Sequence, residues 1–337
     1  NKYGLIMATY KEIRGTNIEV LASDPSNPVE GQVWYNSTTN VLKGKILTAS
    51  AAWSTGGNVN TARYVLGGGG SQTAAIAFGG ATTPGPNSSN ATELYDGASW
   101  TTVNNLNTAR ERLSSAATTS TAALAMGGVV YPGASNQNLT ENWNGTNWTA
   151  VNNLNISEGG RFGFGTPSAA VMAGGGTSSM NETETWNGTN WSNSPATLTT
   201  GRKDNEGGAS GTSTAGIITG GNNGATYDVT ELWNGSAWTE TGDLNTARSG
   251  LMLSGTTTAA IAAGGTPNPT SSATESWNGT NWTTVTSLPS QKRNAGASRT
   301  GGNTAALVFA GYYSTQQNTT FEWNGAGAPQ VKTFTDS

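Results

Sequence analysis

The pattern that dominates the chain is a pair of aromatic residues on either side of a short polar turn. The second aromatic of the pair is a tryptophan that recurs at intervals of 43 to 48 residues, at Trp53, Trp100, Trp148, Trp191, Trp238 and Trp282. The first aromatic keeps the same interval, at Tyr95, Trp143, Trp186, Trp233, Trp277 and Trp323. Asn-Gly or Asp-Gly follows the first aromatic, and these dipeptides favour two-residue type I′ turns. Each element therefore predicts two antiparallel strands joined by a tight turn.

A run of small apolar residues precedes each predicted hairpin and ends in glycine. The runs cover residues 74–80, 122–128, 169–175, 215–221, 259–265 and 305–311. Their length and their mixture of Ile, Val, Leu and Ala favour a buried strand. An alanine-rich helix is the competing interpretation, and the flanking glycines with clustered Thr and Ser argue against it.

Further upstream, each repeat carries a short leader that contains a basic residue. Four leaders are regular and end at Arg63, Arg110, Arg202 and Arg248, and looser versions end at Arg161 and Arg293. A polar strand is expected after each leader. The repeat is thus predicted to contain four strands, and it occurs six times.

These features resemble the kelch repeat of β-propellers: a leader arginine, Gly-Gly after a hydrophobic strand, and two aromatics about five residues apart. The Thr-Glu pairs beginning at Thr92, Thr140, Thr183, Thr230 and Thr274 match a further part of that motif. The resemblance covers roughly residues 45 to 325 and implies an all-β, six-bladed, kelch-like propeller with four-stranded blades. WD40 repeats have a similar period but carry Gly-His and Trp-Asp dipeptides, which this sequence lacks.

The two ends of the repeat region are offset, which suggests how the ring closes. Trp53 matches the tryptophan of a fourth strand, whereas no tryptophan follows Trp323. We therefore expect residues 45–53 to supply the fourth strand of the sixth blade, removing a pair of exposed sheet edges. The predicted domains are an N-terminal attachment segment, residues 1–44, and a propeller with a short C-terminal tail, residues 45–337.

The attachment segment does not follow the repeat. It contains a rigid turn region at 24–28 and two strand-like runs, Val33-Trp34-Tyr35 and Val41-Leu42-Lys43, which predict a hairpin. The string from Glu30 to Gly44 resembles the N-terminal segments of tailed-bacteriophage tail, fibre and appendage proteins. That resemblance implies attachment to other virion proteins. The alternative is an extra hairpin that covers the propeller. Met7 is compatible with a native start, which would make residues 1–6 an extension.

Composition removes several classes of chemistry. The chain has 337 residues with no His and no Cys, so imidazole bases, thiol nucleophiles, and His- or Cys-ligated metals are excluded. This also excludes the Tyr-His-Cys copper site of the oxidase branch of kelch-type propellers. A net charge of −4 with only 16 Lys and Arg gives no footprint for nucleic acid. Neither a membrane span nor a signal peptide is expected.

Glycoside cleavage was the enzymatic alternative, because sialidases also form six-bladed propellers. Such sites need carboxylates at a defined separation. The glutamates at 93, 141, 184, 231 and 275 instead occur once per repeat, as a structural position would. We therefore expect no catalytic, cofactor or metal site.

Recognition is expected on the loops between the second and third strands, because they differ in every repeat whereas the scaffold does not. Their tyrosines are the candidate binding residues: Tyr131, Tyr227, Tyr312 and Tyr313. The alternative is that these tyrosines only pack against the loop stems. The expected ligand is a host surface glycan or protein.

Taken together, the sequence predicts a non-enzymatic bacteriophage structural protein on the virion surface, as a tail fibre, appendage or receptor-binding module. A capsid decoration protein (head fibre) is the first alternative. A secreted bacterial carbohydrate-binding or glycoside-cleaving propeller is the second. Self-association into a homo-oligomer is compatible with each.

Overall fold

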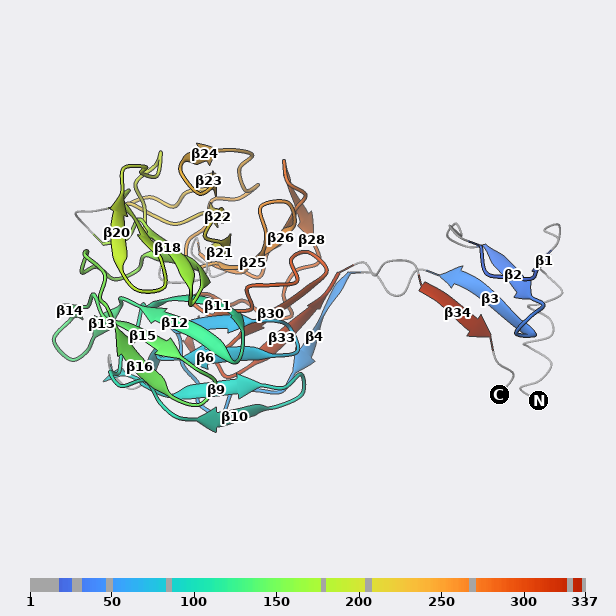
Figure 1. Cartoon of the computed structure of the whole chain (residues 1–337), viewed down its shortest axis with the longest axis horizontal. Helices are drawn as coiled ribbons and strands as arrows, with labels where there is room; N and C mark the ends of the chain where they lie inside the picture. Colours follow the sequence, from blue (N-terminus) through green and yellow to red (C-terminus); the bar gives the residue numbers. More distant parts are fainter. Residues whose placement is uncertain are drawn as a thin grey trace. The chain divides into compact units, whose positions relative to one another are not determined.

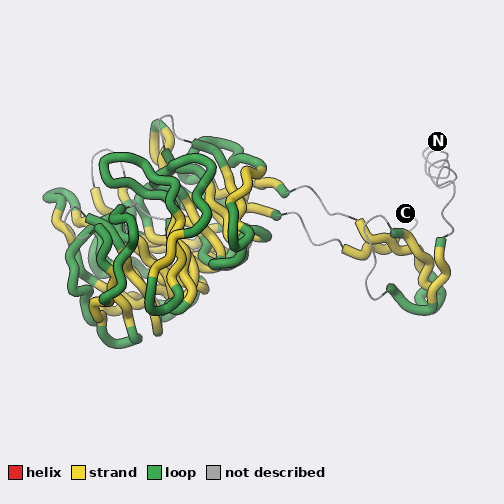
Figure 2. The backbone as a smooth tube through the Cα atoms, turned by 90° about the horizontal axis from the view of Figure 1, so that it is seen from above, coloured by secondary structure: helices red, strands yellow, loops and turns green. Residues whose placement is uncertain are grey.

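The computed structural model describes residues 18–25, 32–46, 51–82, 87–176, 180–203, 208–266, 271–325 and 330–334. These residues contain strands and loops and no helix (Figure 2). Met7 and the Glu30-Gly31 pair of the attachment string lie outside them. The chain divides into two compact units: a terminal unit, residues 1–50 and 326–337, and a main unit, residues 51–325.

The main unit is built from six four-stranded antiparallel sheets within the described residues (Figure 1). Their first strands are β5 (Gly67–Gly70), β11 (Ser114–Thr119), β17 (Phe162–Thr166), β21 (Ala209–Thr212), β25 (Met252–Gly255) and β29 (Gly296–Ala297). The second strands are β6 (Ala75–Phe78), β12 (Ala122–Met126), β18 (Ala169–Ala173), β22 (Ala215–Thr219), β26 (Ala260–Ala263) and β30 (Ala305–Phe309). These second strands are the predicted apolar runs, which are therefore confirmed as buried strands.

The aromatic pairs lie on the third and fourth strands. The third strands are β9 (Thr92–Tyr95), β15 (Thr140–Trp143), β19 (Thr183–Trp186), β23 (Thr230–Trp233), β27 (Thr274–Trp277) and β33 (Thr320–Asn324). The fourth strands are β10 (Trp100–Val103), β16 (Trp148–Val151), β20 (Trp191–Ser194), β24 (Trp238–Glu240), β28 (Trp282–Val285) and β4 (Ala52–Gly56). The two aromatics face each other directly, as in the register of Trp143 with Trp148.

The predicted two-residue type I′ turn is wrong. Because Trp143 pairs with Trp148, the loop has the four residues 144–147, closed by a bond from Asn144 N to Asn147 O. Only the glycine, Gly145, takes a positive φ, of 93°. The Asn144 side chain accepts hydrogen bonds from the backbone N–H groups of Thr146 and Asn147, and this Asx turn fixes the loop.

The first strands of successive sheets lie against one another. β11 contacts both β5 and β17, β21 contacts β17 and β25, and β29 contacts β25 and β5. These strands are short and mostly buried, whereas the sequence predicts polar strands at these places. Close approach explains their small residues, because a Cβ built on Gly69 would lie 2.4 Å from Cβ of Ala117.

The sheet that contains the last repeat takes its fourth strand from the N-terminal side. β4 pairs antiparallel with β33, and Trp53 lies opposite Trp323. The strand begins at Ala52, later than the predicted 45–53, because residues 41–46 form a strand of the terminal unit instead. Three two-stranded ribbons project from second-to-third-strand loops: β7 (Ala81–Thr82) with β8 (Asn87–Ser88), β13 (Val129–Val130) with β14 (Ser135–Asn136), and β31 (Tyr312–Tyr313) with β32 (Thr315–Gln316).

The terminal unit is a four-stranded mixed sheet in the order β1–β2–β3–β34. Its strands are β1 (Glu19–Leu21), β2 (Val33–Asn36), β3 (Val41–Ile46) and β34 (Gln330–Phe334). β2 and β3 form the hairpin that the sequence predicts. β34 pairs with β3, so the predicted C-terminal tail is a strand of this unit, and the main unit is inserted between β3 and β34.

Asp24 is the polar centre of the terminal unit. Its carboxylate accepts hydrogen bonds from the Trp34 indole at 3.1 Å and the Asn36 amide at 2.8 Å, and it pairs with Lys43 at 2.7 Å. These donors, the ammonium of Lys43 first, lower the pKa of Asp24 to about 2. Asp24, at the start of the predicted turn region, thus orders the hairpin, whereas residues 26–28 of that region lie outside the described residues.

Candidate functional site

The leader arginines are buried and bind the third-strand glutamates. Arg63 Nη2 lies 2.8 Å from Glu93 Oε1, and both side chains are at most 1% exposed. The other Glu93 oxygen accepts a bond from the backbone N–H of Asn60. Arg63 Nη1 donates to the carbonyls of Gly79 and Ala91. One ion pair therefore fixes the leader, the glycine pair and the third strand together.

The same pairing recurs in four more sheets: Arg110–Glu141, Arg161–Glu184, Arg202–Glu231 and Arg248–Glu275. Burial lowers the pKa of Arg63, Arg110, Arg161 and Arg248, and the neighbouring glutamate opposes that shift in each case. The repeated glutamates are thus occupied by arginine and backbone donors, as expected for a structural position.

In the sixth sheet the structural position belongs to Lys292, where the sequence suggested Arg293. Lys292 is fully buried, and its ammonium donates to the carbonyls of Ala310 and Thr319 and to the Thr319 hydroxyl. Phe321 replaces the glutamate, and the ammonium lies 5.1 Å from its ring centroid. Burial lowers the pKa of Lys292 to about 7 because no carboxylate faces it among the described residues.

The tryptophans pack within sheets and bond between them. All members of both series are at most 9% exposed. The fourth-strand indoles donate to threonine hydroxyls of the preceding sheet, in the pairs Trp53–Thr274, Trp100–Thr320, Trp148–Thr92, Trp191–Thr140, Trp238–Thr183 and Trp282–Thr230. The sequence indicated buried tryptophans, but it did not indicate these hydroxyl partners.

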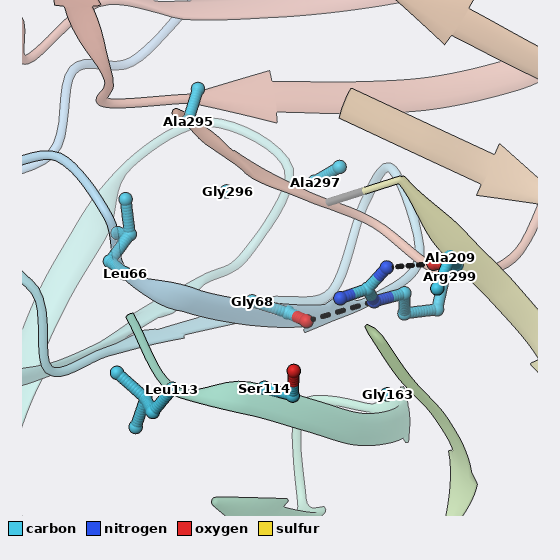
Figure 3. A pocket seen from close by; sticks show the side chains of 10 residues that line it. All are labelled: Leu66, Gly68, Leu113, Ser114, Gly163, Ala209, Ala295, Gly296, Ala297 and Arg299. Atoms are coloured by element: carbon cyan, nitrogen blue, oxygen red, sulfur yellow. Dashed lines mark hydrogen bonds between the residues drawn. The ribbon is translucent and has the colours of Figure 1, made fainter. Parts of the chain in front are cut away.

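Arg299 fills the place where the first strands meet (Figure 3). Its guanidinium donates to the Gly68 carbonyl, the Ala209 carbonyl and the Ser115 hydroxyl, which belong to three other sheets. Burial lowers its pKa to about 10. The remaining cavity is about 10 Å³, which holds about one water molecule. This cavity is too small for a sugar or cofactor.

The four candidate tyrosines do not form one cluster. Tyr131 and Tyr227 are half-buried in the loops of two different sheets, and Tyr313 is 44% exposed. Tyr312 packs against Tyr64 with ring centroids 5.2 Å apart, and the Arg293 guanidinium lies 5.1 Å from the Tyr312 centroid. The structure therefore adds Tyr64 and Arg293 to the candidate set.

A further set of positions was missed by the sequence reasoning. In five of the six sheets, the residue directly after the leader's basic residue forms an isolated β-bridge to the residue that follows the small apolar run. We call these the bridge positions: Tyr64, Glu111, Lys203, Ser249 and Arg293. Their backbone contacts are constant, whereas their side chains differ completely. The sequence signal that could have found the bridge positions is that the side chain directly after the leader's basic residue differs from repeat to repeat.

Glu111 is the bridge position with unusual electrostatics. It is 3% exposed, and burial raises its pKa despite Arg112, whose Nε lies 3.6 Å from Oε1. Its Oε2 has no hydrogen-bond partner. The described part of the chain contains no group of three or more potential metal ligands of the His, Cys, Asp and Glu types, and it contains no helix that could span a membrane.

Comparison with known proteins gives a structural match without a sequence match. No family model and no curated protein matches the chain. A solved structure described as "Structure of YjhT" superposes with a TM-score of 0.61 at 13% identity, covering 79% of this chain and 96% of that one. At this identity the likeness shows the fold alone, which is a β-propeller-like, all-β architecture.

Proposed function

We propose that the main unit is a six-bladed, kelch-like propeller whose last blade is completed by β4. The six four-stranded sheets support the blade number. The contact between β29 and β5, and the bond from Trp100 to Thr320, support closure between the last and first blades. The kelch assignment rests on the leader arginine, the glycine pair and the aromatic pair, which occur together in five of the six sheets.

We further propose that the protein is a non-enzymatic bacteriophage structural protein that displays this propeller on the virion surface and binds a host surface. The attachment role rests on the N-terminal string and on the separate terminal unit. Because β3 and β34 flank the main unit in the sequence and pair with each other, the propeller is an insertion with two covalent connections. Such a topology suits a display module, since both connections must be cut to release it.

The observation that carries the binding role is the contrast between scaffold and bridge positions. The repeated arginines and glutamates bind each other in buried ion pairs, as Arg63 and Glu93 do. Arg299 fills the space where the first strands meet. Side-chain variety is concentrated instead at the bridge positions and in the loops beside them. Variable side chains on a rigid repeat scaffold are characteristic of recognition surfaces.

The test is binding of the purified protein to candidate host cells, combined with its detection in purified virions. A receptor-binding protein is present in virions and binds cells. Presence in virions without binding to cells identifies a capsid decoration protein and rejects the receptor role. Absence from virions rejects the structural role.

Glu111 supplies the one observation that favours the enzymatic alternative, because a buried carboxyl with a raised pKa can act as a general acid. A screen of glycan cleavage with the intact protein and with Glu111→Gln tests it. We expect no cleavage by either protein. Cleavage that Glu111→Gln abolishes would establish a glycoside-cleaving enzyme instead.

A further inference from the structure

Two of the bridge positions, Ser249 and Arg293, line an open hollow. It has a volume of about 570 Å³ and is lined by Asn222, Thr226, Ser249, Thr266 and Arg293, together with Gly224 and Ala225. These residues come from three consecutive sheets. Asn222 and Thr226 follow β22 of the fourth sheet, Ser249 and Thr266 form a bridge beside β25 and β26 of the fifth, and Arg293 bridges to Tyr312 in the sixth. The hollow is wide open to solvent, so a bound ligand would lie on this surface and would not be enclosed by it.

The lining combines one cation with neutral hydrogen-bonding groups. Hydroxyl groups come from Thr226, Ser249 and Thr266, and an amide comes from Asn222. None of the described lining residues carries a carboxylate. Groups of this kind suit a ligand with many hydroxyls, since each can donate or accept a hydrogen bond.

Arg293 is oriented but has no counter-ion. Its guanidinium is held against the Tyr312 ring at 5.1 Å, and Tyr312 is in turn packed on Tyr64. The described residues provide no carboxylate within ion-pair distance of Arg293, and its buried Nε has no hydrogen-bond acceptor. A guanidinium is suited to carboxylate or phosphate, which it binds through paired N–H donors.

We propose that this hollow binds a sugar residue that carries a negative charge, either a carboxylate or a phosphate. Arg293 binds the charged group, and the hydroxyls of Ser249, Thr266 and Thr226 with the Asn222 amide bind the sugar hydroxyls. The inference rests on the proposed binding role and names the ligand class for it. None of the four tyrosines that the sequence indicated lines the hollow, although Tyr312 contacts Arg293 and Tyr227 directly follows Thr226.

The experiment uses the full chain and saturation-transfer difference NMR with three sugar probes, D-glucuronate, D-glucose 6-phosphate and D-glucose, and with inorganic phosphate as a competitor. We expect at least one charged sugar to bind about tenfold or more tightly than glucose. Comparing glucuronate with glucose 6-phosphate identifies the anion. Inorganic phosphate should displace the charged sugar only weakly, because it lacks the hydroxyls.

The variants separate charge from packing. Arg293→Gln should weaken binding of the charged sugar about ten- to a hundredfold, as expected for loss of a charged hydrogen-bond donor. Arg112→Gln is the matched control, because it removes the same charge at a residue outside the hollow. Thr226→Val keeps the charge and removes one hydroxyl, so it should weaken binding of the sugar without abolishing its preference for the anion. Circular dichroism melting of each variant verifies folding.

Equal binding of charged and neutral sugars, or unchanged binding by folded Arg293→Gln, would overturn the proposal. Displacement by inorganic phosphate as effective as that by the sugar would overturn its sugar part. The outcome is separable from the proposed function. Binding to host cells without a charged-sugar site rejects this inference alone, and a charged-sugar site in a protein absent from virions rejects the virion role alone.

Discussion

The indole Nε1 of Trp100 donates a 3.0 Å hydrogen bond to the hydroxyl of Thr320, and so joins two sheets whose residues are 220 positions apart. Both groups are buried, and the same indole-to-threonine bond recurs between the other neighbouring sheets, as between Trp148 and Thr92. Each bond therefore links the fourth strand of one sheet to the third strand of the preceding sheet. It also leads to a direct test.

Thr320→Val should lower the free energy of unfolding by about 1–3 kcal/mol, because the buried indole N–H loses its acceptor while the side-chain shape is retained. Thr92→Val is the internal comparison and should have a similar effect through Trp148. Urea unfolding followed by far-ultraviolet circular dichroism measures both. Full stability in either variant would show that its bond contributes nothing.

Removing one member of a buried ion pair should be more damaging than removing both. Glu141→Gln leaves the Arg110 guanidinium buried without its counter-ion, and we expect a loss of about 3–5 kcal/mol. The double variant Arg110→Met/Glu141→Leu should recover much of that loss, since no charge remains to be desolvated. A double variant as unstable as Glu141→Gln would contradict this account.

The stability of the protein should depend on pH through Lys292. Its pKa is lowered to about 7 in the folded state from an ordinary value of 10.5, so between these values the unfolded chain binds a proton that the folded chain does not. Stability therefore rises with pH from about 7 to 10.5, by at most about 1.4 kcal/mol per pH unit, and falls as the pH is lowered toward 7. Below about pH 7 the slope disappears, because both states are protonated.

The measurement is the difference in unfolding free energy between the protein and Lys292→Met at several pH values between 6 and 9.5. Subtracting the variant removes the contribution of other titrating groups. The Lys292 ammonium also contacts the Phe321 ring and three oxygen acceptors, and these contacts oppose the lowering of its pKa. The slope of about 1.4 kcal/mol per pH unit is therefore an upper bound. Parallel pH profiles for the two proteins would refute the assignment.

The tyrosine hypothesis separates into two expectations. Tyr312→Ala should weaken binding to host cells, because Tyr312 orients Arg293 and packs on Tyr64. Tyr131→Ala should weaken it only if the bound surface extends to the loop of the second sheet. Both variants should melt as the intact protein does, since neither side chain belongs to a buried core. Unchanged binding by both variants would argue against a role of the tyrosines.

The sequence by itself determined the repeat and its local chemistry. Small apolar runs followed by two glycines predicted the second strands, because only glycine adopts positive φ without strain, as Gly79 and Gly80 do. Paired aromatics predicted the third and fourth strands, although the turn between them was assigned the wrong length. Pairing of the leader arginines with glutamates was not predicted, since register between distant segments is set by packing.

Only the tertiary structure decided which residues meet across the repeats. Lys292 stands where the other sheets have an arginine, and Phe321 stands where they have its glutamate partner. The two differences are understood together, because the Lys292 ammonium lies over the Phe321 ring. β34 joins β3, and the charged hollow brings together residues from 222 to 293 that lie on three sheets. These contacts depend on how the sheets are ordered and how closely their first strands approach. The periodicity of a sequence specifies each sheet, whereas the side chains that face one another between sheets are specified by packing.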